Sequence, residues 1–249
     1  MNRIAAALAI LSLLGFSTHA HAADIVGKAM TLPASERPVQ VTYFRAPGQG
    51  PRPSVLLLHG AIGFESEIAN YTRYASDLAN SGIDAYLVYY YSDADKLARA
   101  SHRNIFQTRY DAWIKLADDL ADHLVKQPDS NGKVGLIGFS LGAMITAAAS
   151  ARDPAISAAV IYYGTLPAAK QASVTRFPPL LFLHGDADTV IPLERGRHLA
   201  DLARKLGAPV EFQVYPGAHH GFGALLQTPA GTDAEARAIA FLGRELKTH

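Results

Sequence analysis

Apolar runs alternate with amphipathic stretches along most of the chain. Continuous apolar runs bounded by Gly or Pro are typical of strands buried on both faces, and β-branched and aromatic residues are enriched in strands. On these grounds we predict strands within residues 39–46, 54–60, 80–91, 131–140, 155–164, 178–185 and 209–217. Apolar residues that recur at helical spacing predict helices around residues 68–78, 113–124, 141–151, 193–206 and 233–246.

This alternation predicts an α/β fold with a mainly parallel central sheet and helices on both faces. The stretch "GQGPRP" at 48–53 predicts a turn, and a polar segment at 92–106 separates a predicted strand from the next helix. No repeat, low-complexity tract or long linker follows residue 23, so we expect residues 23–249 to form a single domain. Ligands of such sheets bind at the carboxyl ends of the strands, so the polar residues there are the candidates for chemistry.

The first 22 residues have a different pattern. Arg3 precedes an apolar run from Ile4 to Phe16, and Ala20-His21-Ala22 fits a small-x-small cleavage site. We expect a secretory signal peptide over residues 1–22, cleaved after Ala22, and a periplasmic or secreted mature protein. A membrane anchor is the alternative, but about 13 apolar residues are too few to span ~30 Å of hydrocarbon as a helix. No membrane anchoring is therefore expected after cleavage.

Charge and cysteine content narrow the possible functions. Lys and Arg total 23 against 22 Asp and Glu, a formal net charge of +1, so no charge excess draws the chain toward nucleic acid. The sequence has no cysteine, which excludes disulfides, thiolate zinc sites and a thiol nucleophile.

Residues 138–142, "GFSLG", form a G-x-S-x-G pattern that is weak by itself but well placed. The pattern follows an apolar predicted strand and opens an alanine-rich predicted helix, which is the setting of a nucleophile elbow. Ser140 is therefore a candidate nucleophile, and the N–H of Leu141, at a helix start, a candidate oxyanion donor. The alternative is a small residue that caps a packed helix.

A serine nucleophile needs a base, and the base needs a carboxylate to orient it. The stretch "HGDADTVIP" (184–192) follows a predicted strand, and Asp186 and Asp188 both fit the acid by position. The stretch "YPGAHHGF" (215–222) follows the next strand, and local chemistry leaves its His219 and His220 equivalent as the base. The chain order Ser, Asp, His is that of α/β-hydrolases.

Together, "GFSLG", "HGDADTVIP" and "YPGAHHGF" resemble the motifs of the dienelactone hydrolase family of α/β-hydrolases, over about Val39 to the C-terminus. The resemblance implies an α/β-hydrolase fold, catalysis without a cofactor, and a triad of Ser140, Asp188 and His220. It places the two oxyanion N–H groups on Leu141 and, in the loop "HGAIGFE", on Ala61. Asp186 and His219 are then expected to be loop residues.

The sequence departs from the family at three positions. Typical members have a cysteine nucleophile where this chain has Ser140, a glutamate where it has Gly60, and a substrate-binding arginine where it has Ala224. Related serine members act on simple esters. We therefore expect an exported serine hydrolase that cleaves small-molecule carboxylic esters through an acyl-enzyme. The alternatives are a hydrolase of short peptides or acylated amino acids, and a non-catalytic exported binding protein with a hydrolase fold.

Other polar and aromatic residues have a structural interpretation and a functional one. His59 and His184 end predicted strands and are expected to be hydrogen-bonded structural residues. A metal site is the alternative for part of this group, although the spacing follows no ligand motif; its members would be His184, Asp186, Asp188, His219 and His220. Arginines in and after 92–106 are either anion binders or solvated: Arg99, Arg103 and Arg109. Six aromatic residues belong either to the core or to the substrate pocket: Tyr89, Tyr90, Tyr91, Trp113, Tyr162 and Tyr163.

Overall fold

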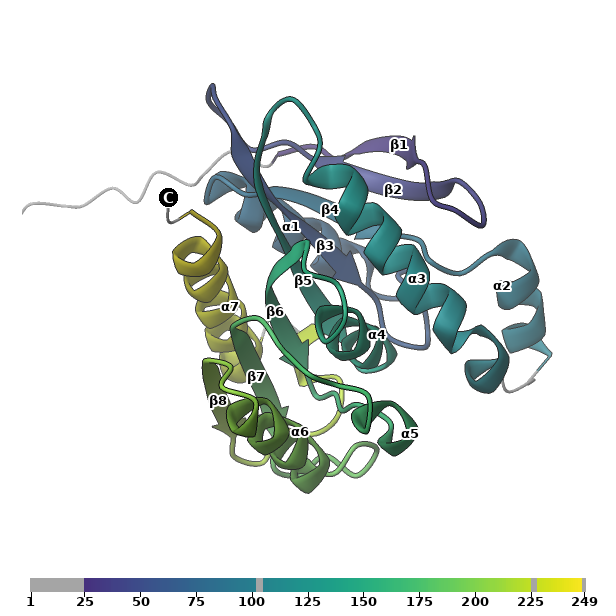
Figure 1. Cartoon of the computed structure of the whole chain (residues 1–249), viewed down its shortest axis with the longest axis vertical. Helices are drawn as coiled ribbons and strands as arrows, with labels where there is room; N and C mark the ends of the chain where they lie inside the picture. Colours follow the sequence, from purple (N-terminus) through teal and green to yellow (C-terminus); the bar gives the residue numbers. More distant parts are fainter. Residues whose placement is uncertain (1–24, 102–104, 225–227, 248–249) are drawn as a thin grey trace, which may run out of the picture.

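The computed structural model describes residues 25–101, 105–224 and 228–247. Its strands form one eight-stranded sheet in the order β1-β2-β4-β3-β5-β6-β7-β8 (Figure 1). β2 is antiparallel to β1 and β4, and all other neighbouring strands are parallel. The strands are β1 (Lys28–Leu32), β2 (Val39–Phe44), β3 (Arg52–Leu58), β4 (Asp84–Val88), β5 (Ser130–Phe139), β6 (Ile156–Tyr162), β7 (Leu180–Gly185) and β8 (Val210–Tyr215).

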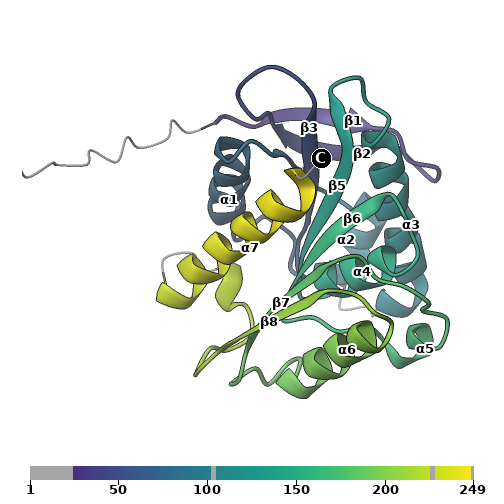
Figure 2. The ribbon, with the colours of Figure 1, turned by 60° about the vertical axis from the view of Figure 1, so that its left-hand side comes forward.

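Helices cover both faces of the sheet, as the alternation of patterns predicts (Figure 2). On one face lie α1 (Ile68–Asn80) and α7 (Pro229–Lys247), and on the other α3 (Phe106–Leu124), α4 (Leu141–Ser150) and α6 (Leu193–Lys205). Successive β3 side chains alternate between the two resulting cores: Leu57 packs with α1 and α7, while Leu56 and Leu58 pack with α3 and α4. This double burial accounts for the uninterrupted apolar runs of the central strands.

Four elements were not predicted from the sequence: β1, α2 (Asp93–Ala100), α5 (Ala168–Gln171) and the short 3-10 helix η1 (Phe222–Ala224). β1 is an edge strand that buries only Leu32, so it has no apolar alternation to reveal it. α2 lies in the polar 92–106 segment and starts at a capping box, in which Ser92 and Asp95 bond each other's backbone N–H. The capping box is a sequence signal for the start of this helix, and a reading of the hydrophobic pattern alone does not include it.

Several predicted boundaries also shift. α3 begins at Phe106, well before the predicted 113–124 stretch. β3 begins at Arg52, inside the predicted 48–53 turn, where Arg52 pairs with β5 and its buried side chain forms ion pairs with Asp84 at 3.2 Å and Asp129 at 2.9 Å. α7 begins at Pro229 rather than near Asp233, with Pro at the helix start, where its missing N–H costs no helical hydrogen bond.

Two predictions fall on residues outside the described ranges. They are the signal peptide at 1–22 and the role of Arg103. Within the described ranges, no helix combines the length and the apolarity that crossing a membrane requires.

Candidate active site

Ser140 lies on a sharp turn between β5 and α4, at the carboxyl edge of the sheet. Its backbone has φ 54° and ψ −110°, which a residue with a Cβ rarely adopts. Strain of this kind costs about 1–3 kcal/mol and persists only where the surroundings hold it. The Ser140 N–H donates to the carbonyl of Tyr162 at 3.1 Å, and the Phe139 ring stacks on the Tyr162 ring with centroids 4.5 Å apart. β6 therefore supports the turn from one side.

The two glycines that flank Ser140 are required by close packing. A Cβ on Gly142 would lie 2.1 Å from the carbonyl oxygen of Leu58, and one on Gly138 would lie 2.3 Å from that of Gly142. Because both neighbours are backbone atoms, they cannot move aside as a flexible side chain would. The G-x-S-x-G pattern thus reflects the contact of α4 with the ends of β3 and β5.

His220 joins Ser140 to Asp188 through two short hydrogen bonds. His220 Nδ1 lies 2.8 Å from Asp188 Oδ2, and His220 Nε2 lies 2.8 Å from Ser140 Oγ. An ionised carboxylate can only accept, so Nδ1 carries the imidazole proton and Nε2 is free to accept the serine hydroxyl proton. The His220 side chain is 19% exposed, whereas that of Asp188 is fully buried. The imidazole can therefore meet a ligand, and the carboxylate cannot.

The loop after β7 fixes Asp188. Its Oδ1 accepts hydrogen bonds from the N–H groups of Val190 and Ile191, both at 2.9 Å, which leaves Oδ2 directed at His220. The Tyr163 ring packs against the His220 imidazole at a steep angle, with the two ring centroids 4.8 Å apart. Tyr163 has φ 36°, a second strained backbone beside Ser140.

The structure separates the two aspartates and the two histidines that the sequence left equivalent by local chemistry. Asp186 Oδ1 accepts from the Gly217 N–H at 2.6 Å, and the Ala187 N–H donates to the Ala218 carbonyl at 3.2 Å. His219 is exposed, and its Nδ1 lies 3.1 Å from the Ala187 carbonyl oxygen. Asp186 and His219 therefore tie the loops after β7 and β8 together, while Asp188 and His220 face Ser140.

Of the two predicted oxyanion donors, Leu141 directly follows Ser140, and the loop that contains Ala61 passes nearby. Leu141 is the first residue of α4, where N–H groups have no acceptor within the helix. A Cβ on Gly60 would lie 3.6 Å from Ser140 Cβ, so the loop after β3 passes next to the nucleophile. The carbonyl of Ala61 in that loop accepts from the Tyr91 hydroxyl at 3.1 Å. Tyr91 was one of several aromatic candidates, and no sequence signal marks this contact.

Both strand-end histidines are buried and hydrogen-bonded. His59 Nδ1 lies 2.7 Å from the Gly60 carbonyl oxygen, and its ring stacks on Tyr90. His184 Nε2 lies 2.8 Å from the Ile191 carbonyl oxygen. Burial lowers the pKa of His59 to about 4 and also lowers the pKa of His184, so both are neutral near pH 7. Among the described residues, no three His, Asp or Glu side chains are grouped as ligands of a metal ion.

The arginines and aromatics have distinct environments. Arg99 is exposed on α2, whereas Arg109 forms an ion pair with the buried Asp95 at 2.9 Å. Most of the aromatic candidates belong to the core: Tyr90, Tyr91, Trp113, Tyr162 and Tyr163 are buried, and Tyr89 is partly exposed.

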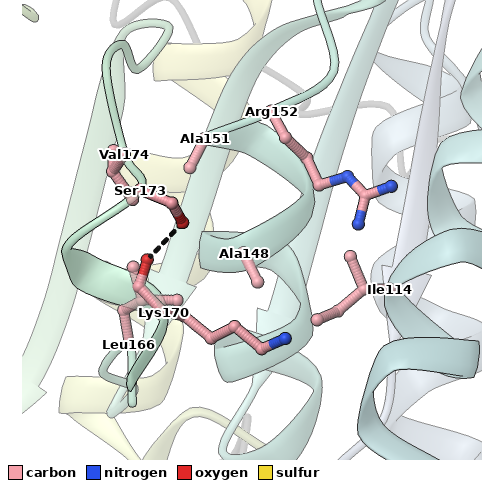
Figure 3. A pocket seen from close by; sticks show the side chains of 8 residues that line it. All are labelled: Ile114, Ala148, Ala151, Arg152, Leu166, Lys170, Ser173 and Val174. Atoms are coloured by element: carbon pink, nitrogen blue, oxygen red, sulfur yellow. Dashed lines mark hydrogen bonds between the residues drawn. The ribbon is translucent and has the colours of Figure 1, made fainter. Parts of the chain in front are cut away.

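A cavity of about 140 Å³ between α3, α4 and the α5 region lies away from these residues. Figure 3 shows its lining, in which the side chains of Arg152 and Lys170 extend toward Ile114 on either side of Ala148. Ala148 is eight residues beyond Ser140 on α4, or about 12 Å at 1.5 Å per residue. A ligand in this cavity would not reach the serine.

The fold and the Ser-His-Asp arrangement define an α/β-hydrolase. The model of the dienelactone hydrolase family matches residues 40–244, and the chain belongs to this family. A candidate carboxymethylenebutenolidase of Yersinia pestis is 26% identical over 196 residues, which are 73% of each protein.

Solved structures agree on the fold. The dienelactone hydrolase of Anabaena variabilis has a TM-score of 0.74 at 18% identity, covering 90% of this chain and 100% of that one. A hyperthermophilic esterase of Pyrobaculum calidifontis has a TM-score of 0.71 at 19% identity, covering 88% of this chain and 85% of that one. These likenesses concern the fold, and the family match over residues 40–244 makes the protein a hydrolase of the dienelactone hydrolase family.

Proposed function

We propose that this protein hydrolyses carboxylic esters through an acyl-enzyme on Ser140, with His220 as the base and Asp188 as the acid that orients it. The observation that carries this proposal is the pair of 2.8 Å hydrogen bonds that join the three side chains. A serine hydroxyl is a poor nucleophile until a base removes its proton, and the imidazole is placed to do so.

In the first half of the reaction, His220 Nε2 takes the Ser140 proton as Oγ attacks the acyl carbonyl carbon. The carbonyl oxygen becomes an oxyanion that the N–H groups of Leu141 and Ala61 stabilise. Asp188 stabilises the imidazolium that forms. The tetrahedral intermediate then expels the alcohol oxygen, which takes the proton from Nε2, and the acyl group stays on Ser140.

In the second half, water replaces the alcohol. His220 Nε2 removes a proton from water as its oxygen attacks the acyl carbon, and a second oxyanion occupies the same two N–H groups. Collapse of this intermediate returns the proton to Ser140 Oγ and releases the carboxylic acid. All bonds and protons balance with ester and water alone.

The positions at which this sequence differs from typical family members indicate the substrate class. Ala224 stands where typical members have a carboxylate-binding arginine, so a dienelactone acid lacks one expected contact. Carboxymethylenebutenolide, the substrate that the name of the Yersinia pestis relative implies for that protein, is therefore a weaker candidate here than an uncharged simple ester. Short peptides and acylated amino acids remain the second candidate, because the same three side chains can cleave amides.

A substrate panel tests the proposal. Mature protein would be assayed on p-nitrophenyl esters, on a dienelactone and on aminoacyl amides. We expect the highest kcat/KM on the esters, and Ser140→Ala should lower it by about 10⁴-fold or more while leaving the thermal midpoint near that of wild type. Full ester activity in Ser140→Ala would overturn the proposal, and a preference for the amides would favour the second candidate.

We also propose that the protein is exported and cleaved after Ala22. The support is the short basic start, the apolar run and the Ala20-His21-Ala22 pattern in the sequence. N-terminal sequencing of protein recovered outside the cytoplasm should begin at Ala23. A mature N-terminus at Met1 would contradict export by this route.

A further inference from the structure

His184 is a buried residue at the end of β7 that contacts the acid of the proposed triad. Its ring is 1% exposed. Nε2 lies 2.8 Å from the Ile191 carbonyl oxygen and 3.5 Å from Asp188 Oδ2, the oxygen that His220 also contacts. The ring therefore approaches the same carboxylate oxygen that His220 contacts.

The protonation state of His184 follows from these partners. A carbonyl oxygen can only accept, so Nε2 carries the proton. Nδ1 is buried, and within the described residues it has no hydrogen-bond partner. A second proton there would have no acceptor, so the ring is held as the neutral Nε2–H form.

The backbone of Ile191 connects His184 to Asp188. Its carbonyl accepts from His184, while its N–H donates to Asp188 Oδ1 at 2.9 Å. The two groups lie on either side of the Ile191 Cα, so anchoring the carbonyl restrains the position of one of the two N–H groups that set the rotation of the carboxylate. The second, from Val190, belongs to the same turn.

We propose that His184 is a positioning residue for the triad: its neutral imidazole anchors the 188–191 turn and thereby keeps Asp188 Oδ2 aligned with His220 Nδ1. This inference rests on the proposed function. It gives His184, which the mechanism does not use, a role in turnover rather than in substrate binding.

Gly196 on α6 completes the arrangement. A Cβ at this position would lie 2.6 Å from His184 Nδ1 and 3.1 Å from Cε1. The glycine therefore allows α6 to lie directly against the His184 ring. A methyl group at this position would displace the ring while the imidazole itself stays in the protein.

The first test compares three substitutions. His184→Leu removes the donor at similar volume, and it should lower kcat by about 10- to 100-fold with KM within about twofold of wild type, because misplaced catalytic groups cost rates of this order. His184→Gln places an amide N–H near the position of Nε2 and should recover most of kcat. Gly196→Ala should lower kcat although His184 is present.

A matched control separates positioning from stability. Leu199→Ala removes a fully buried side chain on α6 that packs in the apolar core on the same face of the sheet as α3 and α4. It should lower the thermal midpoint while kcat at a temperature below the transition stays near wild type. If Leu199→Ala lowered kcat as much as His184→Leu, or if His184→Gln lost as much as His184→Leu, the proposal would be overturned.

A spectroscopic measurement does not depend on the substrate. Proton NMR should detect the His220 Nδ1–H far downfield in wild type, because the proton is shared with a carboxylate, and this resonance should move upfield or broaden in Gly196→Ala and His184→Leu. An unchanged resonance in both variants would overturn the positioning role. A wild-type protein that shows the resonance but cleaves no ester would instead overturn the proposed function.

Discussion

At the scale of single residues, the site depends on which of two adjacent histidines faces the serine. His220 bonds Ser140 and Asp188, whereas His219 is exposed and its ring bonds the backbone carbonyl of Ala187. The local turn chemistry of "YPGAHHGF" does not distinguish the two. The three-dimensional arrangement does, because adjacent side chains leave the loop in different directions.

Paired alanine substitutions test this distinction. His220→Ala should lower kcat/KM by about 10⁴-fold or more, since loss of one triad member removes most of the catalysis. His219→Ala should stay within about tenfold of wild type, because it removes a contact between loops and not a reacting group. Steady-state kinetics on one p-nitrophenyl ester measures both. The reverse order of effects would show that His219 is the base.

At the scale of elements, the site depends on the contact between the start of α4 and the ends of β3 and β5. Neither Gly142 nor Gly138 has room for a Cβ. The contact holds Ser140 in its strained conformation and brings the loop after β3 beside it.

A pair of glycine substitutions separates this contact from helix propensity. Gly142→Ala should lower both the thermal midpoint and kcat, because its Cβ would meet the Leu58 carbonyl oxygen at 2.1 Å. Gly243→Ala, in α7, is the control. Its Cβ would have no heavy atom within 4 Å, so the higher helix propensity of alanine should stabilise the folded protein by about 1 kcal/mol. Differential scanning fluorimetry reads both midpoints. Equal shifts in the two variants would contradict the packing argument.

At the scale of the whole molecule, buried charge makes stability depend on pH. Asp118 on α3 is buried, with Oδ2 3.1 Å from Arg152 Nε and Oδ1 without a partner among the described residues. Burial raises the pKa of Asp118 to about 7, and the Arg152 charge only partly opposes this. Because the folded pKa exceeds the unfolded value, Asp118 stabilises the fold at low pH, and this contribution is lost as pH rises toward about 7.

Asp118→Asn tests this sign. The wild-type thermal midpoint, measured relative to that of Asp118→Asn, should fall between about pH 4 and about pH 7 and level off above that, since in this window the Asp118 carboxyl is ionised in the unfolded chain and protonated in the folded one. The pKa values of His59 and His184 are lowered, which gives the opposite slope, but both proteins share it and it cancels in the difference. Asp111→Asn, an exposed position on the same helix, is the control. Parallel pH curves for wild type and Asp118→Asn would contradict the account.

The sequence predicts the parallel strands and most helices because their burial leaves a strong periodic signal. It does not predict β1, in which only Leu32 is buried, or α2, whose start depends on the Ser92 and Asp95 side chains. The same holds for the site. Motifs identify Ser140, Asp188 and His220, and His184 itself lies in "HGDADTVIP", but the motifs do not reveal the contact of His184 with the Ile191 carbonyl or that of Tyr163 with His220, which depend on the folded arrangement.

The most direct test of the central claim is mass spectrometry of the mature protein after reaction with a fluorophosphonate. Such probes react with serines that a neighbouring base activates. We expect one adduct per chain, on the peptide that contains Ser140, and none in His220→Ala under the same conditions. A protein that hydrolyses esters but carries no adduct on Ser140 would contradict it.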